Sequence, residues 1–190
     1  GNGNNQHRGL APQGRGVFAD YGNVNNRYAH TAQLVDPNDQ YRCVYQSNSW
    51  GDSRTNSYTS KSQEMDDIIY INDIVITQSQ SNAGSTQSRP QAWAKNVVAV
   101  GALYHYGNTS DSDDRWNGGA STGPAADGRI KPDLSAYYDQ IQTTNSGGGG
   151  FGGTSAASPI VAGHFALLHE IWHSGVFGNV VGTSVFNSRP

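Results

Sequence analysis

The chain has 190 residues, of which 35% are apolar and 14% are charged, and its formal net charge is −3. This size and apolar content fit one globular domain, and no stretch approaches the roughly 18 uninterrupted apolar residues of a transmembrane helix. The slightly acidic charge and the absence of a basic cluster argue against a role on nucleic acid or on a membrane surface.

Residue usage bears on compartment and on redox chemistry. The chain is rich in Gly, Asn, Gln and Ser, and this polar but weakly charged composition resembles that of secreted proteins. Its single cysteine, Cys43, excludes an internal disulfide framework and a cysteine-based metal site. No signal-peptide pattern stands at the start of the sequence. We therefore expect a secreted, extracellular protein, present here as a mature or truncated chain.

Strands and helices are expected to alternate along the chain. Short apolar runs predict strands at residues 17–19, 44–48, 73–77 and 94–102, and the third of these reads as a buried parallel strand. Polar residues 22–39 predict loop with room for a short helix. An amphipathic helix is expected over residues 57–72, with one apolar side formed by Met65, Ile68, Ile69 and Ile71. Residues 1–16 and those from 175 onward, which include Val180-Val181 and Val185-Phe186, are expected to be loops.

A turn of small residues at 151–159 leads into the most apolar helical pattern of the chain. The apolar positions after it recur at helical spacing: Val161, Phe165, Leu168 and Trp172. Ser155 should therefore lie at or near a helix N-terminus, with Pro159 in the first turn. Unpaired N–H groups and the positive end of the helix dipole favour negative charge there, as an acyl-transfer nucleophile requires. The alternative is an ordinary N-cap serine that opens a buried helix.

Several segments spread over the chain form longer motifs. They are Arg8-Gly9-Leu10-Ala11-Pro12, Ser47-Asn48-Ser49-Trp50-Gly51, Ser79-Gln80-Ser81-Asn82-Ala83-Gly84, Ala94-Lys95-Asn96-Val97-Val98-Ala99-Val100-Gly101-Ala102, Asp127-Gly128-Arg129-Ile130-Lys131-Pro132-Asp133-Leu134, and Gly153-Thr154-Ser155-Ala156-Ala157-Ser158-Pro159 followed by Ile160-Val161-Ala162-Gly163. In content and order they resemble the motifs of the subtilisin-like serine proteases, the subtilases. The last resembles the nucleophile motif G-T-S-x-A-[ST]-P-x-V-A-G.

The resemblance implies both a fold and a mechanism. The expected fold is a three-layer α/β domain with a mostly parallel sheet flanked by helices, present here as one incomplete catalytic domain over residues 1–190. Ser155 would be the nucleophile of peptide-bond hydrolysis. Asn82 would donate to the oxyanion together with the Ser155 N–H, because an amide offers a fixed donor without a titrating charge.

Further positions are expected to contact a protein or peptide substrate. In the family, the stretch that corresponds to Ser49, Trp50 and Gly51 pairs with the substrate as an added strand. Ser81 stands where the family usually has glycine, so its side chain is expected to narrow the specificity pocket. The small residues before the nucleophile leave room for substrate, which adds Gly153 and Thr154 to the substrate-binding set.

The acid–base half of the expected machinery is not found in these residues. In the family the catalytic aspartate and histidine precede the segment that corresponds to residues 8–12, in D-[ST]-G and H-G-T motifs, and neither motif occurs here. His7 and His30 lack the H-G-T context and are expected on solvated loops. We therefore expect a serine endopeptidase whose Asp and His come from a segment absent here, and which is inactive as this chain alone.

Other interpretations remain open. A catalytically inactive, subtilase-like peptide-binding module is the main alternative, and a carbohydrate-binding domain rests on composition alone. Asp111, Asp113 and Asp114 allow calcium as a structural ion, but without ordered ligand spacing a solvated loop is favoured. No other cofactor is implied. Asn108-Thr109-Ser110 has the form of a glycosylation acceptor, a tripeptide that is common by chance.

Overall fold

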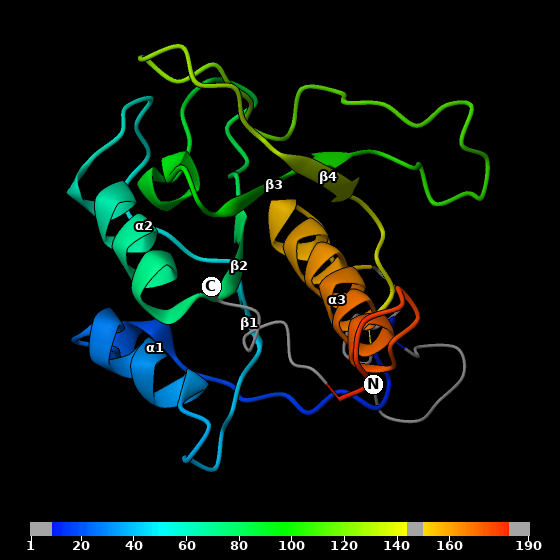
Figure 1. Ribbon diagram of the computed structural model, residues 1–190. Coiled ribbons are helices and arrows are strands. Elements are labelled where there is room, and N and C mark those ends of the chain that lie inside the picture. The colour runs from blue at the N-terminus through cyan, green and yellow to red at the C-terminus, as the bar shows by residue number, and fades with distance from the viewer. Residues whose placement is uncertain (1–8, 144–149, 183–190) are drawn as a thin grey trace.

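A computed structural model describes residues 9–143 and 150–182, and four parallel strands form its sheet (Figure 1). The strands are β1 (Tyr45–Asn48), β2 (Val75–Ser79), β3 (Val98–Leu103) and β4 (Leu134–Tyr137), and their spatial order is β1-β2-β3-β4. Asn48 lies opposite Gln78, and Ser79 opposite Val100. All four strands point the same way, so their carboxyl ends meet at one edge of the sheet.

Helices cover both faces of this sheet. Helices α1 (Arg27–Val35) and α2 (Ser60–Asn72) lie on one side, with the short 3-10 helices η2 (Tyr21–Asn23) and η3 (Pro90–Trp93). Helix α3 (Thr154–His173) lies on the other side and packs across all four strands. Thus the predicted three-layer α/β fold with a parallel sheet is confirmed.

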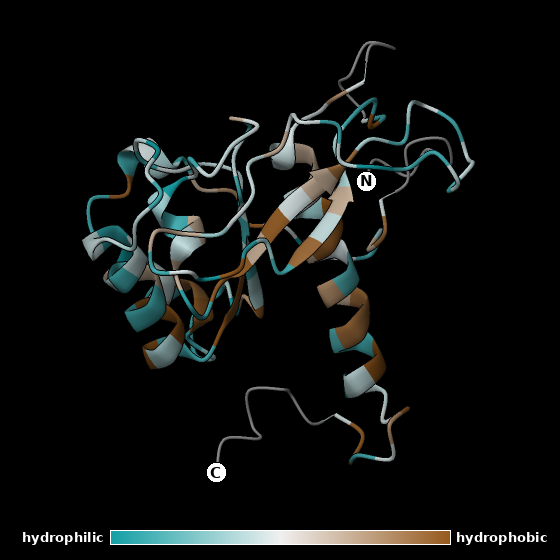
Figure 2. Ribbon diagram, turned by 90° about the horizontal axis from the view of Figure 1, so that it is seen from above, coloured by the Kyte–Doolittle hydropathy of each residue, from teal (hydrophilic) through white to brown (hydrophobic). Residues whose placement is uncertain are grey.

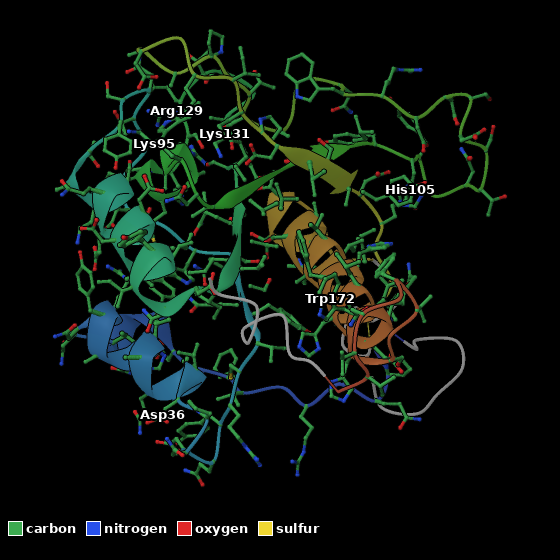
Figure 3. All side chains as sticks on the ribbon, viewed as in Figure 1. Asp36, Lys95, His105, Arg129, Lys131 and Trp172 are labelled. Carbon is green, nitrogen blue, oxygen red and sulfur yellow. The ribbon has the colours of Figure 1, made fainter. Side chains whose placement is uncertain are left out.

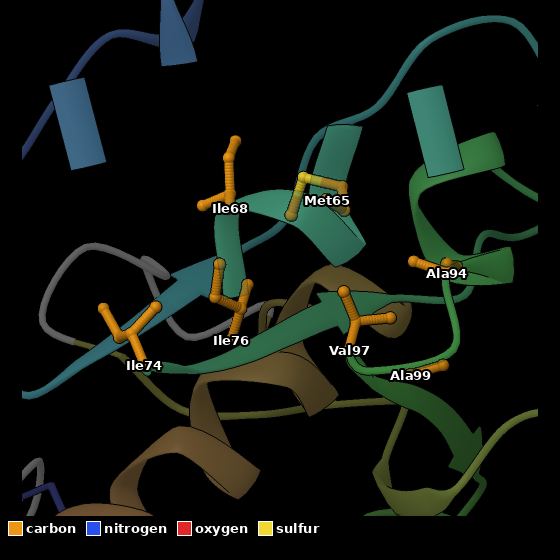
Figure 4. Close-up of a cluster of buried hydrophobic side chains, with 8 residues drawn as sticks. Met65, Ile68, Ile74, Ile76, Ala94, Val97 and Ala99 are labelled. Atoms are coloured by element: carbon orange, nitrogen blue, oxygen red, sulfur yellow. The ribbon is translucent and has the colours of Figure 1, made fainter. Parts of the chain in front are cut away.

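Two apolar clusters join the three layers. Between α2 and the sheet pack Met65, Ile68, Ile74, Ile76, Ala92, Ala94, Val97 and Ala99 (Figure 4). Between α3 and the sheet pack Val100, Ala102, Ala120, Ala157 and Val161. Small residues at the α3 contact bring the helix close to the strands. Full burial of each larger side chain contributes about 1.5–3 kcal/mol.

Local capping decides several boundaries. Helix α2 begins after Thr59, which forms a capping box with Ser62, and it ends at Asp73, whose φ is 49°. The helix predicted over residues 57–72 is therefore confirmed with a later start, although Ile71 is 59% exposed and does not join the apolar side. Because Asp73 caps the helix, strand β2 begins two residues later than predicted.

The strand expected at residues 17–19 does not form. Within the described residues this segment pairs with no strand, and Phe18 is 93% exposed. The side chain of Asp20 instead accepts a hydrogen bond from the Gly22 N–H and starts η2. A run of three apolar residues gains little as a strand without a neighbour, so local turn chemistry prevails.

Helix α3 is longer than the strands on which it packs. Its 20 residues span about 30 Å at 1.5 Å per residue, whereas strands of four to six residues span about 13–20 Å. Its second half consequently extends beyond the strands, as Figure 2 shows. No helix among the described residues is long and apolar enough to cross a membrane. The predictions for Arg8, His7, residues 147–149 and Val185-Phe186 lie outside the described residues.

Candidate active site

Three segments meet where the strands end. Ser49 directly follows β1, Ser81 and Asn82 follow β2, and Ser155 lies in the first turn of α3. The N-terminus of α3 is attached here because the Gly153 N–H donates to the Tyr138 carbonyl at 2.6 Å, just after β4. The sequence-predicted nucleophile, oxyanion donor and peptide-binding segment are thus brought together at the carboxyl edge of the sheet.

Ser155 is the second residue of α3, and Gly153 is the N-cap. The alternative of an N-cap serine is therefore wrong, since the cap carries no side chain. In the described part of the chain, no acceptor is bonded to the Ser155 N–H. That donor and the helix dipole face an approaching oxygen at the same point.

Asn82 is held so that its amide nitrogen faces outward. Its Oδ1 accepts from the Thr154 N–H at 2.9 Å and from the Thr154 hydroxyl at 3.0 Å. This fixes which end of the amide is the acceptor. The Nδ2 group, on an exposed residue, is left without an acceptor among the described residues. Asn82 Nδ2 and the Ser155 N–H are therefore both free, among the described residues, to donate to a ligand, and the expected role of Asn82 at an oxyanion remains a prediction.

Gly153 allows this close approach. Its φ is 82°, and a Cβ built there would lie 3.1 Å from Asn82 Nδ2. Thr154 is only 1% exposed, and its hydroxyl is engaged by Asn82 and by the Ser81 N–H at 3.2 Å. The geometry gives Thr154 a positioning role, which the sequence did not indicate. The substrate contacts expected of Gly153 and Thr154 remain predictions.

Pro159 and Ser49 act on the backbone of Ser155. Pro159 lies in the second turn of α3, not in the first as the sequence suggested, so it removes the N–H that would bond the Ser155 carbonyl. The Ser49 hydroxyl donates to this carbonyl at 3.0 Å, while Ser155 Oγ lies 3.5 Å from the Ser49 carbonyl oxygen. Ser155 is thereby tied to the segment after β1.

Side chains of neighbouring segments hold Ser49–Trp50–Gly51 in place. Gln78, fully buried in β2, donates its amide to the Trp50 carbonyl at 2.6 Å. A Cβ at Gly51 would lie 2.7 Å from Arg89 Cβ, so glycine is required for this packing. Sequence patterns did not reveal Gln78, because its contact joins residues 28 positions apart.

The Trp50 ring forms one wall of a groove beside the site. It stacks on Tyr21 with ring centroids 5.2 Å apart, and the Arg27 guanidinium lies 4.4 Å from its centroid. The groove has a volume of about 920 Å³ and runs along β1, bounded by η2 and α1. Residues 47–50 and Pro159 line it, so it reaches the segment that holds Ser155.

No base is in place at Ser155 among the described residues. The described histidines lie elsewhere: His30 on α1 lines the groove, His105 contacts the Asp139 carbonyl at 2.6 Å, and His164, His169 and His173 lie further along α3. His30 was expected on a loop, and its place on a helix corrects that expectation. In the part of the chain that the structure describes, no cluster of three acidic, histidine or cysteine side chains has the geometry to hold a metal ion, Asp111, Asp113 and Asp114 included.

Comparisons with known proteins agree with this architecture. The sequence matches the subtilase family over residues 1–175. The self-cleaved protease domain of PatA gives a TM-score of 0.60 at 22% identity, over 88% of this chain and 62% of that one. The PatG macrocyclase in complex with peptide gives 0.58 at 18% identity, over 91% and 49%. The prenylagaramide maturation protease PagA gives 0.57 at 22% identity, over 80% and 50%. The chain thus spans about half the length of several solved structures that it matches.

Proposed function

Because this chain belongs to the subtilase family, a family of serine peptidases, we propose that it carries the nucleophile half of a serine endopeptidase. The observation that carries the proposal is the orientation of Asn82. Two hydrogen bonds from Thr154, the neighbour of Ser155, occupy its Oδ1 and leave its amide N–H₂ without an acceptor among the described residues. A protein that only bound peptides would gain nothing from two donors focused beside a serine hydroxyl.

The proposed reaction is acyl transfer. Ser155 Oγ attacks the scissile carbonyl and its proton passes to a histidine, while Asn82 Nδ2 and the Ser155 N–H stabilise the oxyanion. The C–N bond then breaks, the proton goes to the leaving amine, and water releases the acyl group by the same steps. The histidine, and the aspartate that orients it, belong to a segment outside these 190 residues.

The groove along β1 offers a place for that segment. In the described residues β1 pairs with β2 on one side only, so its outer backbone edge is open to another strand. The groove of about 920 Å³ borders this edge and reaches Ser49, whose hydroxyl holds Ser155. A segment bound there would approach Ser155 from the side of β1.

The substrate is a peptide chain that adds as a strand to residues 49–51. Gln78 and the Ser155 carbonyl hold this segment in place before any substrate arrives, which lowers the cost of ordering it. The likeness to a macrocyclase solved with bound peptide supports this choice. We propose an extracellular location for such an enzyme, on the ground of its polar, weakly charged composition.

A peptide-binding module without chemistry is the second candidate. It is favoured by one observation, the lack of any histidine bonded to Ser155 among the described residues. The two candidates predict different affinities for a tetrahedral group in place of the scissile carbonyl. A catalytic site binds a tetrahedral group more tightly than a planar one, whereas a binding module binds both with the same affinity.

A peptide boronic acid separates the candidates, because it forms a tetrahedral adduct with a serine hydroxyl without needing turnover. We expect it to bind more tightly than the same peptide with a terminal amide. The gain should vanish in Ser155→Ala and fall about tenfold or more in Asn82→Leu. Equal affinities of the two peptides, unchanged in both variants, would favour the binding module.

A further inference from the structure

We propose that Arg54 makes this site selective for acidic peptides, by pairing with an Asp or Glu side chain on the residue that carries the scissile carbonyl. The inference deepens the proposed function and rests on it. It names the substrate class of the same site.

Arg54 is linked to the reacting centre by a short chain of contacts. Its Nε donates to Ser81 Oγ at 2.8 Å. The Ser81 N–H in turn donates to the Thr154 hydroxyl at 3.2 Å, and Thr154 adjoins Ser155. Ser81 also directly precedes Asn82. The guanidinium is therefore held beside the residues that would bind the oxyanion.

The conformation of Ser81 indicates that the contact is specific. Its φ is 114°, which side chains with a Cβ rarely adopt, and the residue is only 4% exposed. Such strain costs on the order of 1–3 kcal/mol and persists where the surroundings impose it. Here the strained, buried serine places its hydroxyl where it accepts a hydrogen bond from a guanidinium.

The charge of Arg54 is not neutralised within the described residues. Arg27 pairs with Glu64 and Arg129 with Asp127, but no described carboxylate lies within 4 Å of the Arg54 guanidinium. The side chain is exposed, with Nη1 and Nη2 left for a planar acceptor. A carboxylate fits these two donors as a bidentate pair.

The field of this charge also reaches the start of α3. Burial raises the pKa of Tyr138, with Tyr104 adding to the effect, while the positive charge of Arg54 lowers it. The Tyr138 carbonyl accepts from Gly153, the N-cap of α3. The charge of Arg54 therefore acts on Tyr138, the residue to which the N-cap of α3 is bonded.

Geometry selects which substrate residue meets Arg54. The scissile carbonyl oxygen must lie between Asn82 Nδ2 and the Ser155 N–H, and its own residue runs along residues 49–51. The side chain of that residue branches from the Cα next to the carbonyl and so lies between the segment at 49–51 and that at 81–82. Arg54 follows the first segment in sequence and contacts the second in space.

Binding of four fluorescent peptides to this chain tests the inference by anisotropy. The peptides end in an amide and differ only in their last residue: Glu, Gln, Leu or Lys. Glu and Gln have the same shape, so their difference reports charge. We expect Glu to bind about tenfold more tightly than Gln, and the difference to shrink as salt rises.

Variants show which residue causes the preference for the Glu peptide. Arg54→Ala should remove the difference between Glu and Gln, and Arg54→Glu should transfer the preference to Lys. Ser81→Gly should weaken the preference although it relieves the positive φ, so its folded state should be at least as stable as that of the wild type. Arg42→Ala is the matched control and should leave the preference unchanged. This exposed arginine precedes β1 and so lies at the amino ends of the strands, whereas the proposed site lies at their carboxyl ends.

The outcomes separate the two proposals. Equal binding of the Glu and Gln peptides, with affinity for both, overturns the role of Arg54 and leaves the peptide site standing. Loss of the preference in Arg42→Ala as well shows a general charge effect and also overturns it. Failure of all four peptides to bind counts against the peptide site itself. Urea unfolding of each variant identifies any that fail to fold.

Discussion

Two residues far apart in the sequence act on the same backbone carbonyl at the start of α3, which sequence motifs do not reveal. Pro159 deprives the Ser155 carbonyl of its helical partner, and Ser49, from a segment 106 positions earlier, supplies a hydroxyl instead. The two residues exert opposite effects on one carbonyl. The position of the nucleophile is therefore shared between the helix and the segment after β1.

A double-mutant cycle tests this arrangement. Ser49→Ala should lower the free energy of unfolding by about 1 kcal/mol, the typical value of one hydrogen bond. In a Pro159→Ala background the same change should cost less, because an alanine N–H at position 159 again bonds the Ser155 carbonyl. Urea unfolding of the four proteins gives the coupling, and strict additivity would contradict the shared role.

Gly153 offers a second test at this scale. Gly153→Ala meets two obstacles, a φ of 82° and Asn82 Nδ2 only 3.1 Å from the new Cβ. Gly178→Ala is the matched control, since its φ is 81° but no atom lies within 4 Å of its Cβ. Both should lose about 1–2 kcal/mol of stability from strain. Only Gly153→Ala should also weaken binding of the peptide boronic acid; equal losses of affinity in both would contradict a steric role at Asn82.

Among the secondary-structure elements, α2 is tied to the approach to β3 through Asp66. Its carboxylate accepts from the Tyr58 hydroxyl at 2.9 Å and from the backbone N–H groups of Lys95 and Asn96. The Tyr58 ring is covered by Lys95, 5.5 Å from the ring centroid, and by Arg129, 5.0 Å from it; both cations are labelled in Figure 3. This cluster joins the segments that precede α2, β3 and β4.

The cluster predicts an alkaline stability limit. Burial, the hydrogen bond to Asp66 and its negative charge raise the pKa of Tyr58 to about 12, although Arg129 lowers it. Since the folded-state pKa exceeds the unfolded value of about 10, stability is fully present below pH 10 and is lost as the pH rises towards 12. Tyr58→Phe should abolish this part of the loss. Thermal unfolding at pH 8 and pH 11 measures it, and equal pH sensitivity of both proteins would contradict the assignment.

At this scale the sequence predicted what local patterns determine. Helix α2, strands β1 to β3 and the turn before α3 follow from apolar spacing and small residues, and were predicted within a few positions. Strand β4 was not predicted, since its pattern is too short. The strand expected at 17–19 was wrong, because pairing with a neighbour decides whether three apolar residues form a strand. Ser155 and Asn82 lie within motifs, whereas Arg54, Gln78 and the role of Thr154 depend on distant contacts.

At the scale of the whole molecule, the described residues form a parallel sheet whose outer strands, β1 and β4, each pair on one side only. The described residues bring together Ser155, Asn82 and the segment Ser49–Trp50–Gly51 at the carboxyl ends of the strands, and we propose these as nucleophile, oxyanion donor and peptide-binding segment. A groove lies along the open edge of β1. We propose that the acid–base residues lie in a segment that binds along this groove.

Reaction with a fluorophosphonate probe tests this account most directly, with the labelled residue mapped by mass spectrometry. The protein isolated from its natural source should be labelled at Ser155, and Ser155→Ala should remove the label. The 190-residue chain alone should react no faster than Ser155→Ala, because among the described residues no base is bonded to the hydroxyl. Rapid labelling of Ser155 in the isolated chain, or a natural protein labelled elsewhere or not at all, would contradict the account.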